Sequence, residues 1–587
     1  MAPRPSNRTS SHRRLTRRGL VAGALLTGGM SAGAIGARRL TDRSAMRTAS
    51  PTATSPSVAV SPTAPAATTK PNDLLALEHA TVGQLRRALD ARQLSVAELV
   101  AWSLARVEAM DGGDRGLGAV IELNPEALEI AATRDRELAR EEGRGPLHGV
   151  PVLVKDLFAT ADAMETTAGS LALLDNAVVR DAFVVDRLRA AGAIILGKAN
   201  LTEWSNFEGS SQTSGWSSRG GQTHNPYRLD RSPWGSSSGS AVAVAAGYVP
   251  LALGVETDGS IVAPASATAT VGFKPTVGLT SRSGVIPISF TQDSPGPMAR
   301  TVEDAAYLLT AIAGYDPADP AYGEVGWTAP AALFAEFPVH EPGAVDYTRF
   351  LDADGLRGAR IGVARDLFYV DDAGALVDEV LPVLEAAGAI IVDPAPMPTV
   401  EDLAPGQTEW AVTITEFPYA LERYLANYAP NGPMWGIADI VAYNEAHADE
   451  ALVYFDQAVF YDALEAGSVW DEYYQEMAGN GLALAREQGI DAVMDELELD
   501  ALIAPTTGAP TAISLGGDDF PGACSQISAI AGYPIINVPV GYVDGLPVGM
   551  SFMGRAFSEP TLITLAYAFE QVHPVRRPPE YLAGSAE

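Results

Sequence analysis

Hydrophobic residues recur with the spacing of secondary structure only after about residue 75. Ser95 and Glu98 form the pattern of an N-terminal capping box, in which a serine is followed three residues later by a glutamate. Apolar residues then recur largely on one stripe of a helix, which predicts an amphipathic helix from Ser95 to about Met110. The residues expected on this stripe are Leu99, Trp102, Leu104 and Val107.

Short apolar runs alternate with helical stretches along most of the remaining chain. Runs of this kind are typical of strands that are buried on both faces of a sheet. We therefore expect an α/β protein whose sheet is covered by helices on both faces. No repeat or low-complexity segment interrupts this pattern, which indicates a single large body domain. The predicted strands are Val150–Val154, Ala193–Leu196, Tyr248–Leu253, Ala359–Val363 and Ala389–Val392.

The head of the chain does not follow this pattern. Residues 1–50 contain ten arginines and one acid, Asp42. Arg17 and Arg18 precede a stretch, residues 19–37, that has no charged residue and is too short and too weakly apolar for a good transmembrane helix. Residues 1–40 are therefore predicted to be a twin-arginine export signal. A disordered basic tail and an uncleaved membrane anchor are the alternatives.

The next segment, residues 41–74, is rich in Ser, Thr, Pro and Ala and is predicted to be a flexible linker, because it cannot bury enough apolar area to order itself. The body domain is predicted to span residues 75–578, with a C-terminal tail over residues 579–587. No stable membrane insertion is expected after cleavage of the signal, which would leave a protein that is secreted or held in the cell envelope.

The body is globular in composition and strongly acidic. Hydrophobic residues make up 47% of the chain and charged residues 19%, which excludes disorder over the whole length. A single cysteine, Cys524, excludes a disulfide framework and a cysteine-based metal cluster. The formal net charge is −32, and the basic head contributes +9, so the rest carries −41. Such a charge argues against nucleic acid and anionic membranes as partners.

Two segments of the body combine a strand end with a reactive group. Lys155 directly follows the apolar run Val150–Val154. Either its ammonium group reaches water, or the lysine is partly buried and desolvation lowers its pKa enough for the neutral amine to act as a base. Ser260 follows Gly259 shortly after the predicted strand Tyr248–Leu253. Backbone N–H groups can converge on an oxyanion in such a loop, and a plain glycine turn is the alternative reading.

A third segment, residues 235–240, is a Gly/Ser loop that leads into a short apolar helix. It is either a plain turn or a functional loop, and it lacks the lysine of a phosphate loop. Ser237 formally sits at the centre of a nucleophile-elbow pattern, but no strand precedes the pattern as an elbow requires. None of the seven histidines has metal-ligand spacing, and we predict neither a metal site nor a cofactor.

Taken together, the order and spacing of these segments resemble the amidase signature family over about residues 75–575. Residues 200–204, 219–223, 256–260 and 289–293 look most like the peptide amidase subgroup. The resemblance implies an amidase signature fold with a large mixed sheet in a single catalytic domain. The other segments that carry it are Lys155 with its preceding strand, the serine loop 235–240, and residues 272–279, 504–507, 532–541 and 545–550.

The resemblance also implies a Ser–cisSer–Lys triad. Ser260 would be the nucleophile, Ser236 the bridging serine after a cis peptide bond, and Lys155 the base. The backbone N–H groups expected to hold the oxyanion are those of Thr257, Asp258, Gly259 and Ser260. The side chains expected to contact substrate are Leu201, Ser237 and Trp234. Trp234 stands where family members usually carry small residues, so it either narrows the site or simply packs.

The implied activity is hydrolysis of a carboxamide through an acyl-enzyme, with release of ammonia or an amine. The expected partner is a small-molecule or peptide amide, and C-terminal peptide amides are the leading candidates. The alternatives are an exported binding protein that keeps the fold without catalysis, an amidotransferase-type subunit, and a histidine-dependent α/β-hydrolase that uses Ser237. Export and the acidic body argue against the amidotransferase. The presence of all three triad positions argues against the non-catalytic protein.

Overall fold

The protein is described here by a computed structural model, which covers residues 76–113, 116–319, 345–403 and 406–583. Asp73–Glu587 form one compact unit. The predicted export signal and linker lie outside the described residues. No helix of the described residues is long and apolar enough to span a membrane.

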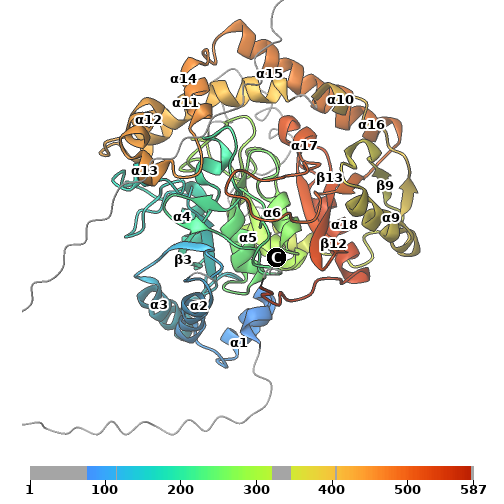
Figure 1. The fold of residues 1–587 in the computed structure, drawn as a ribbon. Coiled ribbons are helices and arrows are strands. Elements are labelled where there is room, and N and C mark those ends of the chain that lie inside the picture. Colours follow the sequence, from blue (N-terminus) through green and yellow to red (C-terminus); the bar gives the residue numbers. More distant parts are fainter. Residues whose placement is uncertain (1–75, 114–115, 320–344, 404–405, 584–587) are drawn as a thin grey trace, which may run out of the picture. The chain divides into compact units, whose positions relative to one another are not determined.

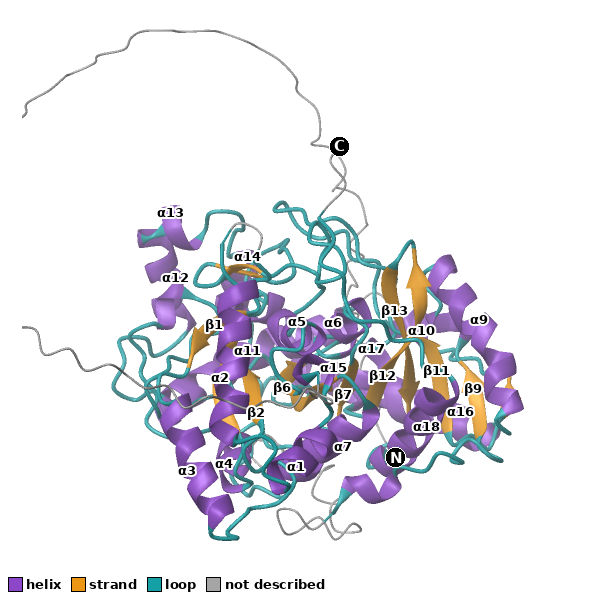
Figure 2. Ribbon diagram, turned by 90° about the horizontal axis from the view of Figure 1, so that it is seen from below, coloured by secondary structure: helices purple, strands orange, loops and turns teal. Residues whose placement is uncertain are grey.

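An eleven-stranded mixed sheet runs through this unit (Figures 1 and 2). Its strand order is β1-β3-β2-β6-β8-β7-β12-β13-β11-β9-β10. Strand β2 is parallel to β3 and β6, and β9 is parallel to β10 and β11, whereas the other neighbours are antiparallel. Strands β1, β2, β3, β6, β7 and β8 form one half of this sheet, and β9 to β13 form the other. Among the described strands, the two halves are joined only by the pairing of β7 with β12.

The strands of this sheet are β1 (Val120–Leu123), β2 (Pro151–Lys155), β3 (Ile194–Ala199), β6 (Leu251–Glu256), β7 (Val271–Lys274), β8 (Ser294–Ala299), β9 (Arg360–Val363), β10 (Ile390–Val392), β11 (Ala501–Pro505), β12 (Ile535–Val543) and β13 (Leu546–Met553). A small hairpin adds β4 (Trp216–Ser217) and β5 (Gly221–Gln222). The described α-helices are α1 (Val82–Asp90), α2 (Val96–Met110), α3 (Ala127–Ala139), α4 (Phe183–Ala190), α5 (Ser238–Ala245), α6 (Val262–Ala267), α7 (Val302–Ile312), α9 (Asp371–Ala386), α10 (Val400–Leu403), α11 (Gln407–Tyr428), α12 (Ile437–Ala446), α13 (Ala448–Ala451), α14 (Ala458–Glu465), α15 (Glu472–Ala485), α16 (Asp491–Glu496), α17 (Gln526–Ala531) and α18 (Glu559–Val572).

Helices cover both faces of the sheet, as the sequence predicted. Side chains on a strand point alternately to opposite faces. Val152 and Val154 of β2 join a core that includes residues of α4, α7, α9 and α18, whereas Leu153 between them joins a second core with α2, α3 and α5. The near-continuous apolar strands therefore have the composition that burial on both faces requires.

The predicted helix and most predicted strands are confirmed. Helix α2 spans Val96–Met110, and its capping box is formed, because Ser95 Oγ accepts from the Glu98 amide at 3.1 Å while the Ser95 amide donates to Glu98 Oε2 at 2.9 Å. Four of the five predicted strands match β2, β3, β9 and β10, with shifts of at most three residues at their ends.

The fifth predicted strand begins later than expected. Strand β6 starts at Leu251 rather than at Tyr248. Gly247 has φ +71° and closes α5, and the Tyr248 amide turns back to Ala243 O at 2.9 Å. Tyr248 and Val249 are buried, but they belong to the turn after the helix. The apolar residues of this turn therefore resembled the start of a strand in the sequence, because buried turns and buried strands have similar compositions.

A helical segment, residues 407–485, adds a layer beside the sheet. It holds α11 to α15, which Figure 1 shows as a yellow and orange arc along one side of the unit. Helix α11 packs against α12, α14 and α15. We call this part the 407–485 segment below, because it forms one wall of the candidate active site.

Candidate active site

The three residues of the predicted triad meet where β2 and β6 end. Lys155 is the last residue of β2, Ser236 lies just before α5, and Ser260 lies between β6 and α6. Strands β2 and β6 are parallel neighbours, so their carboxyl ends lie at the same edge of the sheet. Ligand sites of open α/β sheets form at this edge. The fold thus brings together side chains that are far apart in the sequence.

These side chains form a continuous chain of contacts. Lys155 Nζ lies 2.7 Å from Ser236 Oγ, and Ser236 Oγ lies 2.9 Å from Ser260 Oγ. Lys155 Nζ also donates to Val255 O at 3.2 Å. Lys155 is fully buried and Ser236 nearly so, whereas Ser260 keeps 8% of its surface exposed. The peptide bond between Gly235 and Ser236 is cis, as the family resemblance implied.

Burial changes the acid–base behaviour of Lys155. Removal from water disfavours the ammonium form and lowers the pKa of Lys155 to about 7. The nearby carboxylates of Asp293 and Glu256 oppose this shift without cancelling it. No salt bridge of the described residues includes Lys155. The full burial of Lys155 excludes the alternative of an ammonium group that reaches water, and the lowered pKa favours the neutral amine near pH 7.

The loop that carries Ser260 is held from both sides. Glu256 Oε2 accepts from the amides of Ile261 at 2.7 Å and Val262 at 2.9 Å. On the other side, Thr257 Oγ1 donates to Asp293 Oδ1 at 2.6 Å. These contacts fix the loop between the end of β6 and the start of α6.

The same loop supplies backbone donors. Within the described residues, no protein acceptor takes the amide N–H of Thr257, Asp258 or Ser260. The Gly259 amide instead donates a hydrogen bond to the Glu256 carboxyl group. Burial raises the pKa of Glu256, and this hydrogen bond opposes the increase. Gly259 has φ +75°, which glycine adopts without the strain of a side chain. Three of the four predicted oxyanion donors are therefore left for a ligand.

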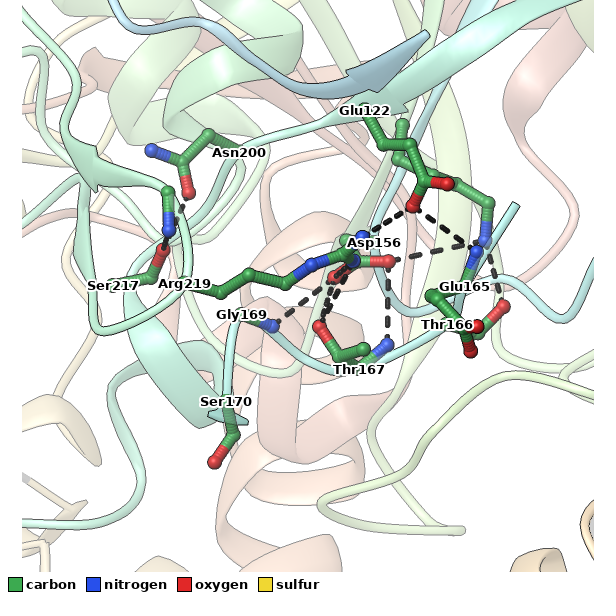
Figure 3. Close-up of polar contacts among 12 residues, drawn as sticks. Glu122, Asp156, Glu165, Thr166, Thr167, Gly169, Ser170, Asn200, Ser217 and Arg219 are labelled. Atoms are coloured by element: carbon green, nitrogen blue, oxygen red, sulfur yellow. Dashed lines mark hydrogen bonds and ion pairs between the residues drawn. The ribbon is translucent and has the colours of Figure 1, made fainter. Parts of the chain in front are cut away.

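A buried polar network surrounds Asp156, the residue that follows Lys155 at the end of β2 (Figure 3). Asp156 Oδ2 accepts from Thr167 Oγ1 at 2.5 Å, from the Gly169 amide at 3.3 Å and from Arg219 Nη1 at 3.3 Å. Lys198 Nζ lies 3.8 Å from its other carboxylate oxygen. Asp156 is fully buried, so these partners fix the backbone next to Lys155.

Replacing Asp156 by alanine is expected to destabilise the fold by about 3–5 kcal/mol, because Arg219 and Lys198 would lose a buried counter-charge. The measurement is a pair of thermal melts. The matched control is Asp90→Ala, which removes the exposed carboxylate of the ion pair between Asp90 and Arg86 and should cost less than about 1 kcal/mol. Equal melting temperatures for the two variants would contradict the structural role of Asp156.

The triad opens into a cavity of about 1030 Å³. Ser236, Ser260 and the loop 257–259 line one side of it. The 407–485 segment lines another side, with residues of α11 and α14. These wall residues were not found from the sequence, because they carry no motif and their helices are far from the triad in the chain. They are Glu409, Trp410, Thr413, Ala458, Val459 and Asp462.

The three side chains predicted to contact substrate lie behind the cavity surface. Leu201, Trp234 and Ser237 are each fully buried, and none lines the cavity. Trp234 packs edge-on against Phe520, which does line it, with ring centroids 5.0 Å apart. Of the two readings of Trp234, packing is the one that its position favours.

Ser237 holds the end of β6 rather than facing a substrate. Its Oγ donates to Val255 O at 3.1 Å and accepts from the Val255 amide at 3.2 Å. None of the described histidines lines the cavity. The arrangement needed by a histidine-dependent hydrolase with a Ser237 nucleophile is therefore not found in the part of the chain that the structure describes.

Comparisons with known proteins agree on the family. A family model described as amidase matches residues 98–563. The native peptide amidase from Stenotrophomonas maltophilia is similar in structure, with a TM-score of 0.80 and 46% identity, covering 86% of this chain and 99% of that chain. A structure of the peptide amidase PAM with the competitive inhibitor chymostatin has a TM-score of 0.80 and 47% identity, with coverage of 86% and 99%. A probable amidase from Arabidopsis thaliana is 43% identical, covering 86% of this chain and 92% of the relative.

Proposed function

The chain belongs to the amidase signature family and is an enzyme that acts on amide bonds, and from this premise we propose that it hydrolyses C-terminal carboxamides of peptides with Ser260 as nucleophile. The observation that carries the proposal is the relay of contacts from Lys155 Nζ through Ser236 Oγ to Ser260 Oγ, at 2.7 and 2.9 Å. A lysine with a pKa of about 7 has a lone pair available at neutral pH.

The first half of the reaction forms an acyl-enzyme. The neutral amine of Lys155 accepts the proton of Ser236, while Ser236 accepts the proton of Ser260. Ser260 Oγ attacks the carbonyl carbon of the amide, and the carbonyl oxygen becomes an oxyanion. The free N–H groups of Thr257, Asp258 and Ser260 would donate to that oxyanion. One such donor is typically worth about 2.7–4 kcal/mol of transition-state stabilisation.

The second half releases both products. The proton held by Lys155 returns through Ser236 to the amide nitrogen, and the carbon–nitrogen bond breaks to release ammonia. A water molecule then gives a proton to the same relay and attacks the ester carbon. Cleavage of the ester returns the proton to Ser260 Oγ and releases the peptide carboxylic acid, whose proton is taken up by the released ammonia to give a carboxylate and an ammonium ion. Protons balance over the cycle, since the relay ends as it began.

The proposed substrate class draws support from two sources. A cavity of about 1030 Å³ is large for a simple aliphatic amide and suits a peptide. The similar solved structures include a peptide amidase with a competitive inhibitor. The test is an ammonia-release screen over peptide amides, free aliphatic amides and aryl amides. Peptide amides are expected to have the highest kcat/KM, and a preference for either other class would overturn the substrate proposal.

We further propose that the protein is exported through the twin-arginine route. The supporting observation is the pair Arg17 and Arg18 before the uncharged stretch of residues 19–37. Replacing both arginines by lysine is expected to leave the precursor in the cytoplasm, as measured by cell fractionation. The matched control replaces Arg38 and Arg39 by lysine and should be exported normally. Equal export of the two double variants would reject this route.

A further inference from the structure

A second groove adjoins the active-site cavity. This groove has a volume of about 410 Å³, and it shares Trp410 and Asp462 with the active-site cavity. It lies between α11, α14 and the chain that leads into α15, so both of its walls belong to the 407–485 segment. We call it the distal groove, because neither Ser236 nor Ser260 lines it. The two shared residues place the groove next to the active-site cavity.

Exposed aromatic rings and carboxylates characterise the distal groove. Trp410 is 42% exposed and Tyr473 is 63% exposed, so both rings are accessible to a ligand in the groove. Its acidic residues are Asp462, Glu465 and Asp471. Among the described residues, no Lys, Arg or His side chain lines this groove or the active-site cavity. Lys155 is buried and contacts Ser236, which does line the active-site cavity.

The carboxylates of the distal groove are not neutralised by the protein. No salt bridge of the described chain includes Asp462 or Glu465. Asp471 differs, because its Oδ2 accepts from the Ser468 amide at 2.8 Å and serves the local turn. Glu465 is the last residue of α14, where the helix dipole is itself negative, so the two contributions have the same sign.

The negative potential extends over the surrounding surface. Residues 407–485 contain thirteen acidic residues and one arginine, Arg423. A cleft lined by charges of one sign concentrates the field and attracts ligands of the opposite charge. A cation held over the face of Trp410 gains a further cation–π attraction, since tryptophan provides the best ring for this contact.

We propose that the distal groove binds the part of a peptide amide remote from its carboxamide, and that it selects peptides with a positive charge there. The charge is that of a lysine or arginine side chain or of a free N-terminal ammonium group. This inference rests on the proposed peptide amidase function and adds to it a subsite and a charge preference. The adjacency of the two cavities, the carboxylates outside any salt bridge of the described residues, and the exposed rings carry it together.

The test uses hexapeptide amides that differ in one position, which is lysine, glutamine or glutamate, moved stepwise away from the carboxamide. A neutral dipeptide amide, too short to reach the distal groove, is the reference. At low ionic strength, kcat/KM for the lysine peptide is expected to exceed that of the glutamate peptide by about tenfold at distal positions. Salt at 0.5 M should reduce this ratio, because it screens exposed charges.

Two variants test whether the distal groove causes the preference for the lysine peptide over the glutamate peptide. In the double variant Asp462→Asn, Glu465→Gln the ratio is expected to fall below about twofold. The matched control Glu476→Gln removes an exposed carboxylate of α15 that lines neither cavity, and it should keep the wild-type ratio. A ratio compares two substrates on the same enzyme, so a loss of folded protein does not change it.

The outcomes separate the two levels of the proposal. If the wild-type enzyme fails to release ammonia from the dipeptide amide, the peptide amidase function itself is rejected. If it hydrolyses the dipeptide amide but treats lysine and glutamate hexapeptides alike, the distal subsite is rejected and the function stands. A preference that survives the double variant would place the charge selection elsewhere and would also overturn this inference.

Discussion

Replacing Ser260 by alanine is expected to lower kcat for a peptide amide by roughly 10⁵- to 10⁶-fold, the scale of loss known for removal of a serine nucleophile. The variant keeps every backbone donor of the loop but has no oxygen to form the acyl-enzyme. The fold should be unaffected, because the Ser260 hydroxyl has Ser236 as its side-chain partner and lies at the cavity surface. Ammonia release measures the loss, and a thermal melt checks the fold.

Ser237→Ala is the comparison that separates the two candidate nucleophiles. Ser237 holds Val255 at the end of β6, so its loss should disturb the site without removing the reacting atom. We expect a loss of less than about 100-fold, far smaller than that of the Ser260 variant. Mass spectrometry of the quenched wild-type enzyme should find the acyl group on the peptide that contains Ser260. Greater damage from the Ser237 variant would contradict the assignment.

Lys155→Met is expected to cost roughly 10³- to 10⁴-fold in kcat, near the upper end of what general acid–base catalysis contributes. Methionine keeps the length and the apolar stem of the side chain but removes the base. Lys155→Arg should be nearly as inactive, because a guanidinium group stays protonated and cannot accept the proton of Ser236. Substantial activity in either variant would show that another group takes the proton. The measurement is single-turnover ammonia release.

The pH profile tests the same residue without a mutation. Burial lowers the pKa of Lys155 to about 7, and the reaction needs the neutral amine. The active fraction therefore falls about tenfold for each pH unit below 7 and approaches its maximum above it. We expect kcat/KM to rise with pH through about 7 and then to level off. A flat profile between pH 6 and 9, with chemistry limiting the rate, would contradict a neutral lysine base.

Local rules were sufficient for the elements that depend on local chemistry. The capping box at Ser95 predicted the start of α2, and the apolar runs predicted β2, β3, β9 and β10. The run at Tyr248 also predicted β6, but its start was placed three residues too early, because apolar residues are buried in turns as well as in strands and the chain turns at Gly247. Strand pairing depends on contacts between distant segments, which no local pattern contains.

The residues of the candidate site likewise fall into those that the sequence located and those that it did not. Lys155, Ser236 and Ser260 stand in motifs, so a family resemblance located them before their contacts were known. Leu201 and Trp234 are also in or beside motifs, yet their side chains turn into the core, and a motif does not give the direction of a side chain. The wall formed by α11 and α14 had no motif at all. Packing alone brings Glu409 and Trp410 to the cavity.

The single junction between β7 and β12 has a consequence for biosynthesis. Ile535 pairs with Lys274, so a ribosome must make more than 250 further residues before β7 gains this partner. Until then the early half of the sheet ends in an unpaired strand, which is a template for association with other chains. A chain that stops before β12 should therefore precipitate or bind chaperones, although all three residues of the proposed relay are already present in it.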